Sequence, residues 1–143
     1  SLIRYTSQNL KLRKYMILNN KIKIFFAIAS FMMALGIALG AFGAHALKSI
    51  LDEYFLKIYN TGIQYHFYNT LGLFAATFIY ALKPDSKKIF ISLWLIIIGM
   101  IIFSFSLYFL AILNMPILGA ITPIGGTLLI IAWLTLTYGI LKD

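Results

Sequence analysis

The hydrophobic positions of this chain form long uninterrupted runs rather than alternating or one-sided patterns. Residues 24–47 and 62–82 contain no charged side chain, and residues 89–141 contain none over a stretch about twice as long. A helix over residues 24–47 would be roughly 36 Å long, which is enough to cross a hydrocarbon core of about 30 Å. The pattern therefore predicts helices that cross a membrane.

The last run is too long for a single crossing, and the residues 114–116, Asn-Met-Pro, lie near its middle. These residue types favour turns, so the run divides into two spans, 89–113 and 117–141. Together with 24–47 and 62–82 they give four spans in a single membrane domain, 24–141, which follows a basic tail, 1–23.

The segment 48–57 is amphipathic, with apolar side chains at helical spacing and charged side chains opposite them. Ser49, followed three residues later by Asp52, resembles a capping box. We expect a short helix in the membrane interface between spans one and two. The predicted fold class is thus all-α: an integral membrane four-helix bundle with a short interfacial helix.

Composition agrees with lipid as the solvent. The chain is 62% hydrophobic and 11% charged, and its mean hydropathy is +0.92, which excludes an ordinary soluble domain and a disordered chain. It contains no cysteine, which excludes disulfides, zinc–thiolate sites, iron–sulfur clusters and thiol nucleophiles.

The net charge of +8 is distributed unevenly over the four-span arrangement. Lys48 and Lys57 are the two cations on one side, and the other side carries Arg4, Lys11, Arg13, Lys14, Lys21, Lys23, Lys83, Lys87, Lys88 and Lys142. The positive-inside rule then places both termini in the cytoplasm or the mitochondrial matrix. The same distribution argues against nucleic-acid binding, because cations beside a membrane are accounted for by the orientation of the protein and by contact with anionic headgroups.

The tail 1–23 fits either a polybasic cytoplasmic segment or the remnant of an organellar targeting sequence. We expect a bacterial or mitochondrial inner membrane.

Small residues recur at helical spacing inside the predicted spans. Helices in lipid associate through close backbone approach, which small residues permit. The expected contact positions are Gly36, Gly40, Gly43, Ala44, Gly72, Ala76, Ser92, Gly99 and Ser106. They mark where the four helices meet, although the glycine ladder of the first span is also compatible with a dimer face.

The fourth span contains Pro123, Gly125 and Gly126, which favour a kink. A re-entrant loop ending there would leave a segment, 127–141, that is too short to cross, so we expect one kinked span. Broken helices also line substrate sites in transporters, which keeps a small-solute transporter or channel open as an alternative.

The polar residues of interest are His45, Gln64, His66 and Asn69. His45 ends the first span and His66 begins the second, so the two histidines should face one another near the non-cytoplasmic boundary. We interpret this polar cluster as hydrogen bonding near the headgroups. A pair of haem ligands, a metal site completed by Glu53 and a proton relay are the alternatives. We predict no metal site and no cofactor. We also predict no catalysis, because Ser104 and Ser106 have no histidine and acid at a fixed spacing to activate them.

Four blocks carry a family resemblance: GAFGAHAL at 40–47, YHFYNTL at 65–71, FSFSLY at 103–108, and ITPIGG at 121–126 with Trp133 after it. In this order they resemble the family known as domain of unknown function 423, or UPF0382, of bacterial inner membranes, with mitochondrial relatives. The resemblance implies four transmembrane helices and no known activity. Asn69 stands where the family commonly has a histidine, and an amide cannot take up a proton. Phe105 stands where a glycine is common.

These observations lead to an expected function. We expect a non-enzymatic integral membrane protein that packs with itself or with a larger membrane complex, with the small-residue stripes as contact surfaces. The lipid bilayer is its first partner. The alternatives are the transporter or channel and, less favoured, a haem- or metal-binding component that uses His45 and His66.

Overall fold

The chain is all-helical in the part that the computed structural model describes, which is residues 1–16 and 18–143, with the side chains of 11–17 excluded. The charges expected at Lys11, Arg13 and Lys14 lie outside the described side chains. The elements in order are α1 (Leu2–Met16), α2 (Asn20–His45), the 3₁₀ turn η1 (Leu47–Ser49), α3 (Glu53–Leu82), α4 (Lys87–Met100), the π turn η2 (Ile101–Phe105), α5 (Ser106–Leu113) and α6 (Leu118–Lys142).

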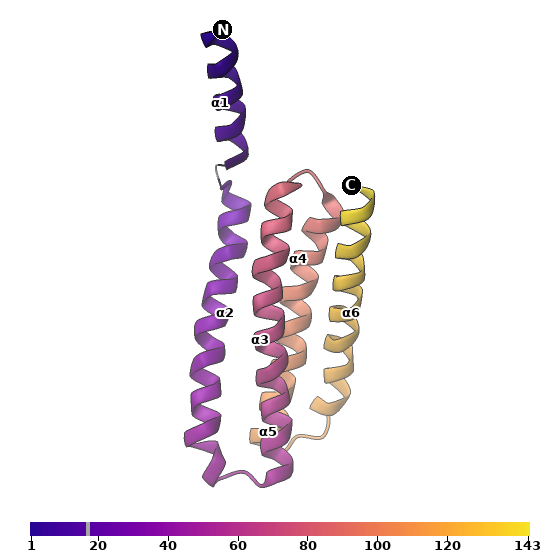
Figure 1. Cartoon of the computed structure of the whole chain (residues 1–143). Helices are drawn as coiled ribbons and strands as arrows, with labels where there is room; N and C mark the ends of the chain where they lie inside the picture. Colours follow the sequence, from indigo (N-terminus) through magenta and orange to yellow (C-terminus); the bar gives the residue numbers. More distant parts are fainter. Residues whose placement is uncertain (17) are drawn as a thin grey trace.

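Four long helical rods lie side by side: α2, α3, the continuous α4–η2–α5 rod, and α6 (Figure 1). The N-terminal α1 extends beyond the end of the bundle, so the segment expected as a tail is helical over α1 (Figure 1). The long helices carry apolar residues all around, as expected of helices in lipid. This arrangement is an all-α membrane bundle, as predicted.

Side-chain caps define where the long helices begin. The Asn19 side chain accepts a hydrogen bond from the Ile22 amide, and the Asp52 side chain accepts one from the Phe55 amide, each at 2.9 Å. Asp52 is therefore the N-cap of α3, and the expectation that Ser49 starts a helix is wrong. The Ser49 hydroxyl instead donates to the Ala46 carbonyl. The interfacial segment is one 3₁₀ turn, and residues 53–57 are the first residues of α3.

The turn between α5 and α6 begins at Asn114, whose φ of 51° is left-handed. Asparagine tolerates this conformation better than other residues with a side chain, and it commonly terminates a helix in this way. Its amide donates to the Leu110 carbonyl. From Leu118 onward α6 continues through Pro123 to Lys142 as one helix, so the structure contains no re-entrant loop at this proline.

Among the residues that the structure describes, three helical segments are long and apolar enough to cross a membrane: Asn20–Ser49, Lys87–Leu113 and Leu118–Lys142. Helix α3 is as long as the longest of them, at 30 residues, but falls outside this set, because polar residues occupy its first half. In the middle of α3, the polar side chains of His66, Asn69 and Thr70 are buried.

The exposed surface of the bundle is apolar and part of its interior is polar. Phe31, Phe78 and Leu134 are 60–66% exposed, whereas the side chains of His66 and Ser92 are fully buried. In water this distribution would expose a large hydrophobic surface. In lipid it is favourable, because polar groups are satisfied inside the protein and apolar groups face the hydrocarbon.

Glycines bring the helices into close contact. The ring of Tyr59 covers Gly43, Leu129 packs on Gly99, and the backbone of Phe103 lies against Gly125. A Cβ added at Gly125 would lie 2.4 Å from the Phe103 nitrogen. These contacts fix the distances between α2 and α3 and between α6 and the α4–η2–α5 rod.

The small-residue positions fall mostly where helices meet. Gly36, Gly43, Ala76, Ser92, Gly99 and Ser106 are buried, Gly40 and Gly72 are half-buried against α3 and Trp133 respectively, and Ala44 is exposed. Ala44 differs because each step of four residues advances the helical angle by 400°. After two such steps from Gly36 the ladder has rotated by about 80° away from α3, whereas Gly43 stays on the contact face.

Candidate functional site

Two polar contacts in the middle of the bundle start from one helix, α3, and reach different neighbouring helices. His66 contacts α2 and the end of the α4–η2–α5 rod. Asn69 contacts Trp133 of α6. Both side chains are buried because they lie on the face of α3 that packs against its neighbours.

The His66 ring is held at both nitrogens. Nε2 lies 2.7 Å from the Met32 carbonyl oxygen, and Nδ1 lies 2.9 Å from the Tyr108 hydroxyl. A carbonyl can only accept, so Nε2 carries the proton. In the neutral ring Nδ1 is then the acceptor and Tyr108 donates to it. The chain of hydrogen bonds runs from Tyr108 through His66 to the backbone of α2.

Glycines make room for this chain. A Cβ added at Gly36 would lie 3.1 Å from His66 Cδ2 and Nε2, and one added at Gly62 would lie 2.7 Å from the Tyr108 ring. The absence of a side chain at Gly36 lets the imidazole reach a carbonyl that already belongs to a helix. Because both ring nitrogens are engaged, neither offers a lone pair to haem or to a metal ion.

The π turn Ile101–Phe105 lies beside this network. It contains Ser104, which is fully buried and whose hydroxyl has no hydrogen-bond partner among the described residues. A π turn holds one more residue than an α-helical turn, and such turns occur often at functional sites. Here it lies one helical turn before Tyr108. The turn also carries Phe103, whose ring lies 4.9 Å from that of Tyr65 between centroids.

The second contact joins α3 to α6. The Trp133 indole donates to the Asn69 side-chain oxygen at 3.1 Å, and the Asn69 amide nitrogen donates to the Tyr65 carbonyl at 2.9 Å. The indole N–H is only a donor, so the orientation of the Asn69 amide follows from chemistry. Gly72 accommodates the indole, since a Cβ there would lie 2.5 Å from Trp133 Cζ2.

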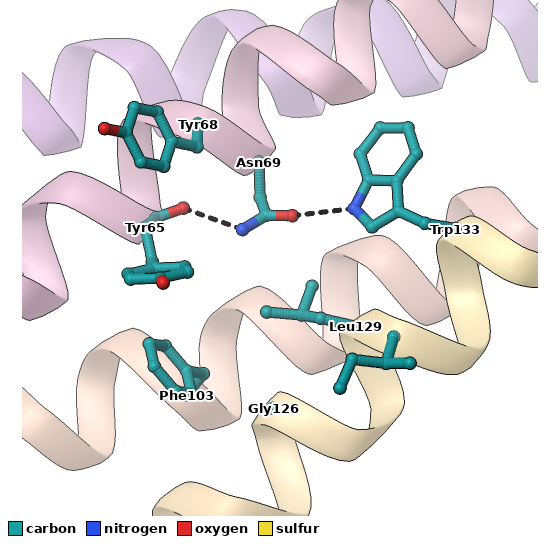
Figure 2. A pocket seen from close by; sticks show the side chains of 8 residues that line it. Tyr65, Tyr68, Asn69, Phe103, Gly126, Leu129 and Trp133 are labelled. Carbon is teal, nitrogen blue, oxygen red and sulfur yellow. Dashed lines mark hydrogen bonds between the residues drawn. The ribbon is translucent and has the colours of Figure 1, made fainter.

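A cavity of about 520 Å³ opens beside this contact. Figure 2 shows the Asn69 amide and Trp133 on one side of the space and Phe103 with Leu129 on the other. Its lining consists of Tyr65, Tyr68, Asn69, Phe103, Gly126, Leu129, Ile130 and Trp133. Four of these are aromatic and none is charged. The volume lies within the range of about 300–1,000 Å³ that is usual for small-molecule sites.

The expected polar cluster is not a single cluster. His45 and Gln64 are exposed, and the Gln64 amide donates to the Tyr68 hydroxyl. The expectation that His45 faces His66 is wrong. Helix α3 begins at Glu53, so His66 lies more than three turns inside it, opposite Met32 rather than at the end of α2.

The structure gives the haem and metal alternative no support. The described residues contain no group of three or more histidine, cysteine or acidic side chains that could hold a metal ion. His45 and His66 do not come together, and Glu53 lies at the start of α3, far along the helix from His66.

Several residues of the site were missed in the sequence. Met32 contributes a backbone carbonyl, which no sequence motif reveals. Tyr108 and Trp133 carry the available signal: each has a polar atom inside an apolar run, and such side chains usually find a hydrogen-bond partner when buried. Thr70, whose hydroxyl lies 3.4 Å from the Met100 sulfur, carries the same signal.

The family model described as "Protein of unknown function (DUF423)" matches residues 39–126. The UPF0382 membrane protein YwdK of Bacillus subtilis is 38% identical over 120 residues, which are 84% of this chain and 98% of that protein. A UPF0382 membrane protein of Haemophilus influenzae is 38% identical over 127 residues, 88% of this chain and 98% of the relative. One from Staphylococcus epidermidis is 39% identical over 120 residues, 84% of this chain and 97% of the relative. No solved structure matches.

Proposed function

We propose a function for this chain as a member of the DUF423 family of membrane proteins, also called UPF0382, to which the matches above show that it belongs. The proposal is that it is a non-catalytic, four-span membrane component that pairs with a second copy of itself. The pairing surface is the outer face of α2. The observation that carries this proposal is the division of α2 into two small-residue faces on opposite sides.

The inner face of α2 is formed by glycines. Gly36 lies against His66 and Phe67, Gly40 lies against Ile63, and Gly43 lies under Tyr59. This face is therefore occupied by α3. The glycine ladder cannot serve at the same time as a dimer face, which was the alternative that the sequence left open.

The outer face of α2 is formed by alanines. Residues 27, 34, 38 and 41 are all alanine and all exposed, and their helical angles lie within about 40° of the direction opposite Gly36. Phe31 and Ile37 flank them and are also exposed. Helices in lipid gain little by hiding apolar surface but gain van der Waals contact when small side chains let backbones approach. A second α2 would fit against this flat face.

The fourth crossing is supplied by α3. Its 30 residues would extend roughly 45 Å, more than one bilayer core requires. Because His66, Asn69, Thr70 and Thr77 are buried, the surface that α3 presents to lipid includes Leu71 and Phe78. Four crossings agree with Figure 1, in which both termini lie at the same end of the bundle, and the positive-inside rule then places that end in the cytoplasm or matrix.

A non-catalytic role agrees with the hydrogen bonding of the interior. The hydroxyls of Thr77 and Ser92 donate to carbonyls of their own helices, as packing residues do. His66 has both nitrogens engaged, and Ser106 pairs with Thr122. These bonds hold helices together, and they also argue against a polar transport path along the bundle.

Disulfide cross-linking tests the pairing directly, because the chain has no cysteine of its own. We expect Ala34→Cys and Ala38→Cys each to give a disulfide-linked dimer in membranes under mild oxidant. Leu134→Cys is the matched control, since Leu134 is 64% exposed on another helix, α6. Ala34→Ile combined with Ala38→Ile should abolish cross-linking through an added Ala41→Cys. Equal cross-linking at 34 and 134, or none at 34 and 38, would show that α2 is not the interface.

The topology has its own test. Asp85→Cys and Met115→Cys lie in exposed turns at the two ends of the bundle. A membrane-impermeant maleimide added to intact cells or mitoplasts should label position 115 and not position 85. Labelling of both positions from one side would show that the α4–η2–α5 rod, which lies between them, does not cross the membrane.

A further inference from the structure

The cavity beside Asn69 is lined by residues of α3 and α6 that lie in the middle part of each helix, and Figure 2 shows these side chains around the space. Its rim includes Tyr68 and Ile130, which are 57% and 64% exposed. In the four-span arrangement this rim faces the hydrocarbon of the bilayer. A ligand would therefore enter from the lipid and not from water.

The walls select a flat, uncharged occupant. The rings of Tyr65, Phe103 and Trp133 surround the space, and Leu129 and Gly126 form the remaining wall. Rings of this kind stack on a planar partner or contact it edge to face. No lining side chain carries a charge, so an ionised headgroup would lose its hydration there without compensation.

The Asn69 side chain supplies a hydrogen-bond donor at the wall. The Asn69 oxygen is occupied by the Trp133 indole, and one of the two amide hydrogens is used by the Tyr65 carbonyl. The second hydrogen has no partner among the described residues. The Tyr68 hydroxyl accepts a hydrogen bond from Gln64 and points away from the space (Figure 2). A molecule that fits the free amide hydrogen of Asn69 offers an acceptor, most simply a carbonyl oxygen.

We propose that this lateral cavity binds a lipid-soluble quinone, that is, a flat ring with a carbonyl oxygen that accepts a hydrogen bond from the Asn69 amide. A plain acyl chain would fill the volume but would leave this donor unsatisfied in an apolar site, which is costly. The proposal concerns binding alone. It involves no residue of α2 and is therefore independent of the pairing of two copies.

The two tryptophans of the chain provide the experiment. Trp133 lines the cavity, whereas Trp94 packs against Phe25 at another place in the bundle. Trp94→Phe leaves Trp133 as the single reporter, and Trp133→Phe leaves Trp94 as the matched control. The probe is 2-methyl-1,4-naphthoquinone, which quenches indole fluorescence, added to full-length protein in lipid nanodiscs.

We expect saturable quenching of the Trp133 reporter and only weak, linear quenching of the Trp94 reporter. In the Trp94→Phe background, Gly126→Leu should fill the cavity and weaken binding at least tenfold. Gly119→Leu is its control on the same helix, because a Cβ at Gly119 meets only a distant Leu110 atom at 4.0 Å. Asn69→Leu should weaken binding about tenfold.

Three results would overturn the proposal. The first is linear quenching of equal strength in both single-tryptophan proteins. The second is unchanged binding in the Gly126→Leu protein while its helix content and thermal stability match those of Gly119→Leu. The third is competition by 2-methylnaphthalene, which lacks the carbonyls, as strong as that by the quinone. Saturable binding that Gly126→Leu removes and 2-methylnaphthalene does not compete for would support it.

Discussion

The two sides of α3 carry polar contacts of the same kind with different results. Toward α2, the imidazole of His66 is hydrogen-bonded at both nitrogens, and it packs so closely on α2 that a Cβ at Gly36 would lie 3.1 Å from it. Toward α6, the hydrogen bond between Asn69 and Trp133 stands at the edge of a cavity of about 520 Å³. A buried polar residue in a membrane helix therefore does not by itself indicate a ligand site. What distinguishes the two sides is the space around it.

The position of glycines explains the difference. On the first side the glycines lie between α2 and α3 and let these two helices approach. On the second side Gly99 and Gly125 hold α6 against the α4–η2–α5 rod. Helix α6 is thus fixed by a neighbour other than α3, and the indole of Trp133 bridges the remaining distance. Helices α3 and α6 do not pack closely here, because α6 packs tightly against the α4–η2–α5 rod instead.

The largest effect should follow from breaking the contact that holds α6 in place. Gly125→Ala would place a Cβ 2.4 Å from the Phe103 nitrogen and 2.7 Å from its Cα. These are backbone atoms, so the helices must separate, and we expect a loss of about 3 kcal/mol in the free energy of unfolding.

Gly126→Ala is the adjacent control. Its Cβ would lie 3.5 Å from the Phe103 ring, so this variant should leave the stability unchanged or raise it slightly. Unfolding in mixed micelles followed by circular dichroism measures both, and equal losses would contradict this account.

The next largest effect should arise on the closed side. His66→Leu removes the acceptor of the buried Tyr108 hydroxyl, and we expect a loss of about 2 kcal/mol in the same measurement. Combining it with Tyr108→Phe removes the unpaired hydroxyl, so the double variant should lose less than the sum of the two single losses. Strict additivity would show that the two rings do not interact.

A smaller effect is expected on the open side. Asn69→Leu deprives the Trp133 indole of its acceptor where the cavity already limits packing, and we expect a loss of about 1 kcal/mol. In the Trp94→Phe background the emission of Trp133 should shift to shorter wavelength, because an indole without a hydrogen bond in an apolar site emits at higher energy. An unchanged spectrum would show that the indole is not bonded to Asn69.

The smallest effect should come from a surface contact far from either side of α3. Hydrogen bonds from Ser86 and Lys88 lower the pKa of Asp143 below its ordinary value. A lowered pKa in the folded protein means that this contact stabilises the fold above the pKa of the unfolded chain, and that the stabilisation is lost as the pH falls through the folded value. The contact is exposed and screened by solvent, so its contribution is small. The stability difference between the protein and Asp143→Asn should therefore be present at about pH 6 and shrink as the pH falls below about 3.9, the ordinary pKa of an aspartate. A difference that does not change in acid would exclude this carboxylate as its source.

Much of the fold follows from the sequence, because long uncharged runs leave few alternatives to helices in lipid. The all-helical bundle and the turn at Asn114 could be predicted in this way. The burial of individual small residues follows less directly, since a step of four residues drifts around the helix and leaves Ala44 exposed. The start of α3 was also misplaced, because its first turns are polar and do not look like a membrane span. That one error moved His66 from the middle of the bundle to its edge and suggested a pair with His45.

The candidate site was less accessible to prediction. Asn69 and His66 are visible in the sequence, but their partners are a backbone carbonyl and aromatic residues on helices distant along the chain. The cavity depends on the distance between α3 and α6, which is set by contacts of Gly99 and Gly125 with third residues. No local pattern encodes such a distance.

The π turn makes the bundle sensitive to the deletion of a single residue in this segment. Its one additional residue rotates everything downstream on that rod by about 100° relative to a continuous α-helix. Deleting a single residue among 101–105 would restore the α-helical phase, turn the Tyr108 hydroxyl away from His66 and carry Phe103 off Gly125. Apolar substitutions in this segment can therefore be tolerated. Deletion of one residue cannot, because it would change the helix contacts in the middle of the bundle.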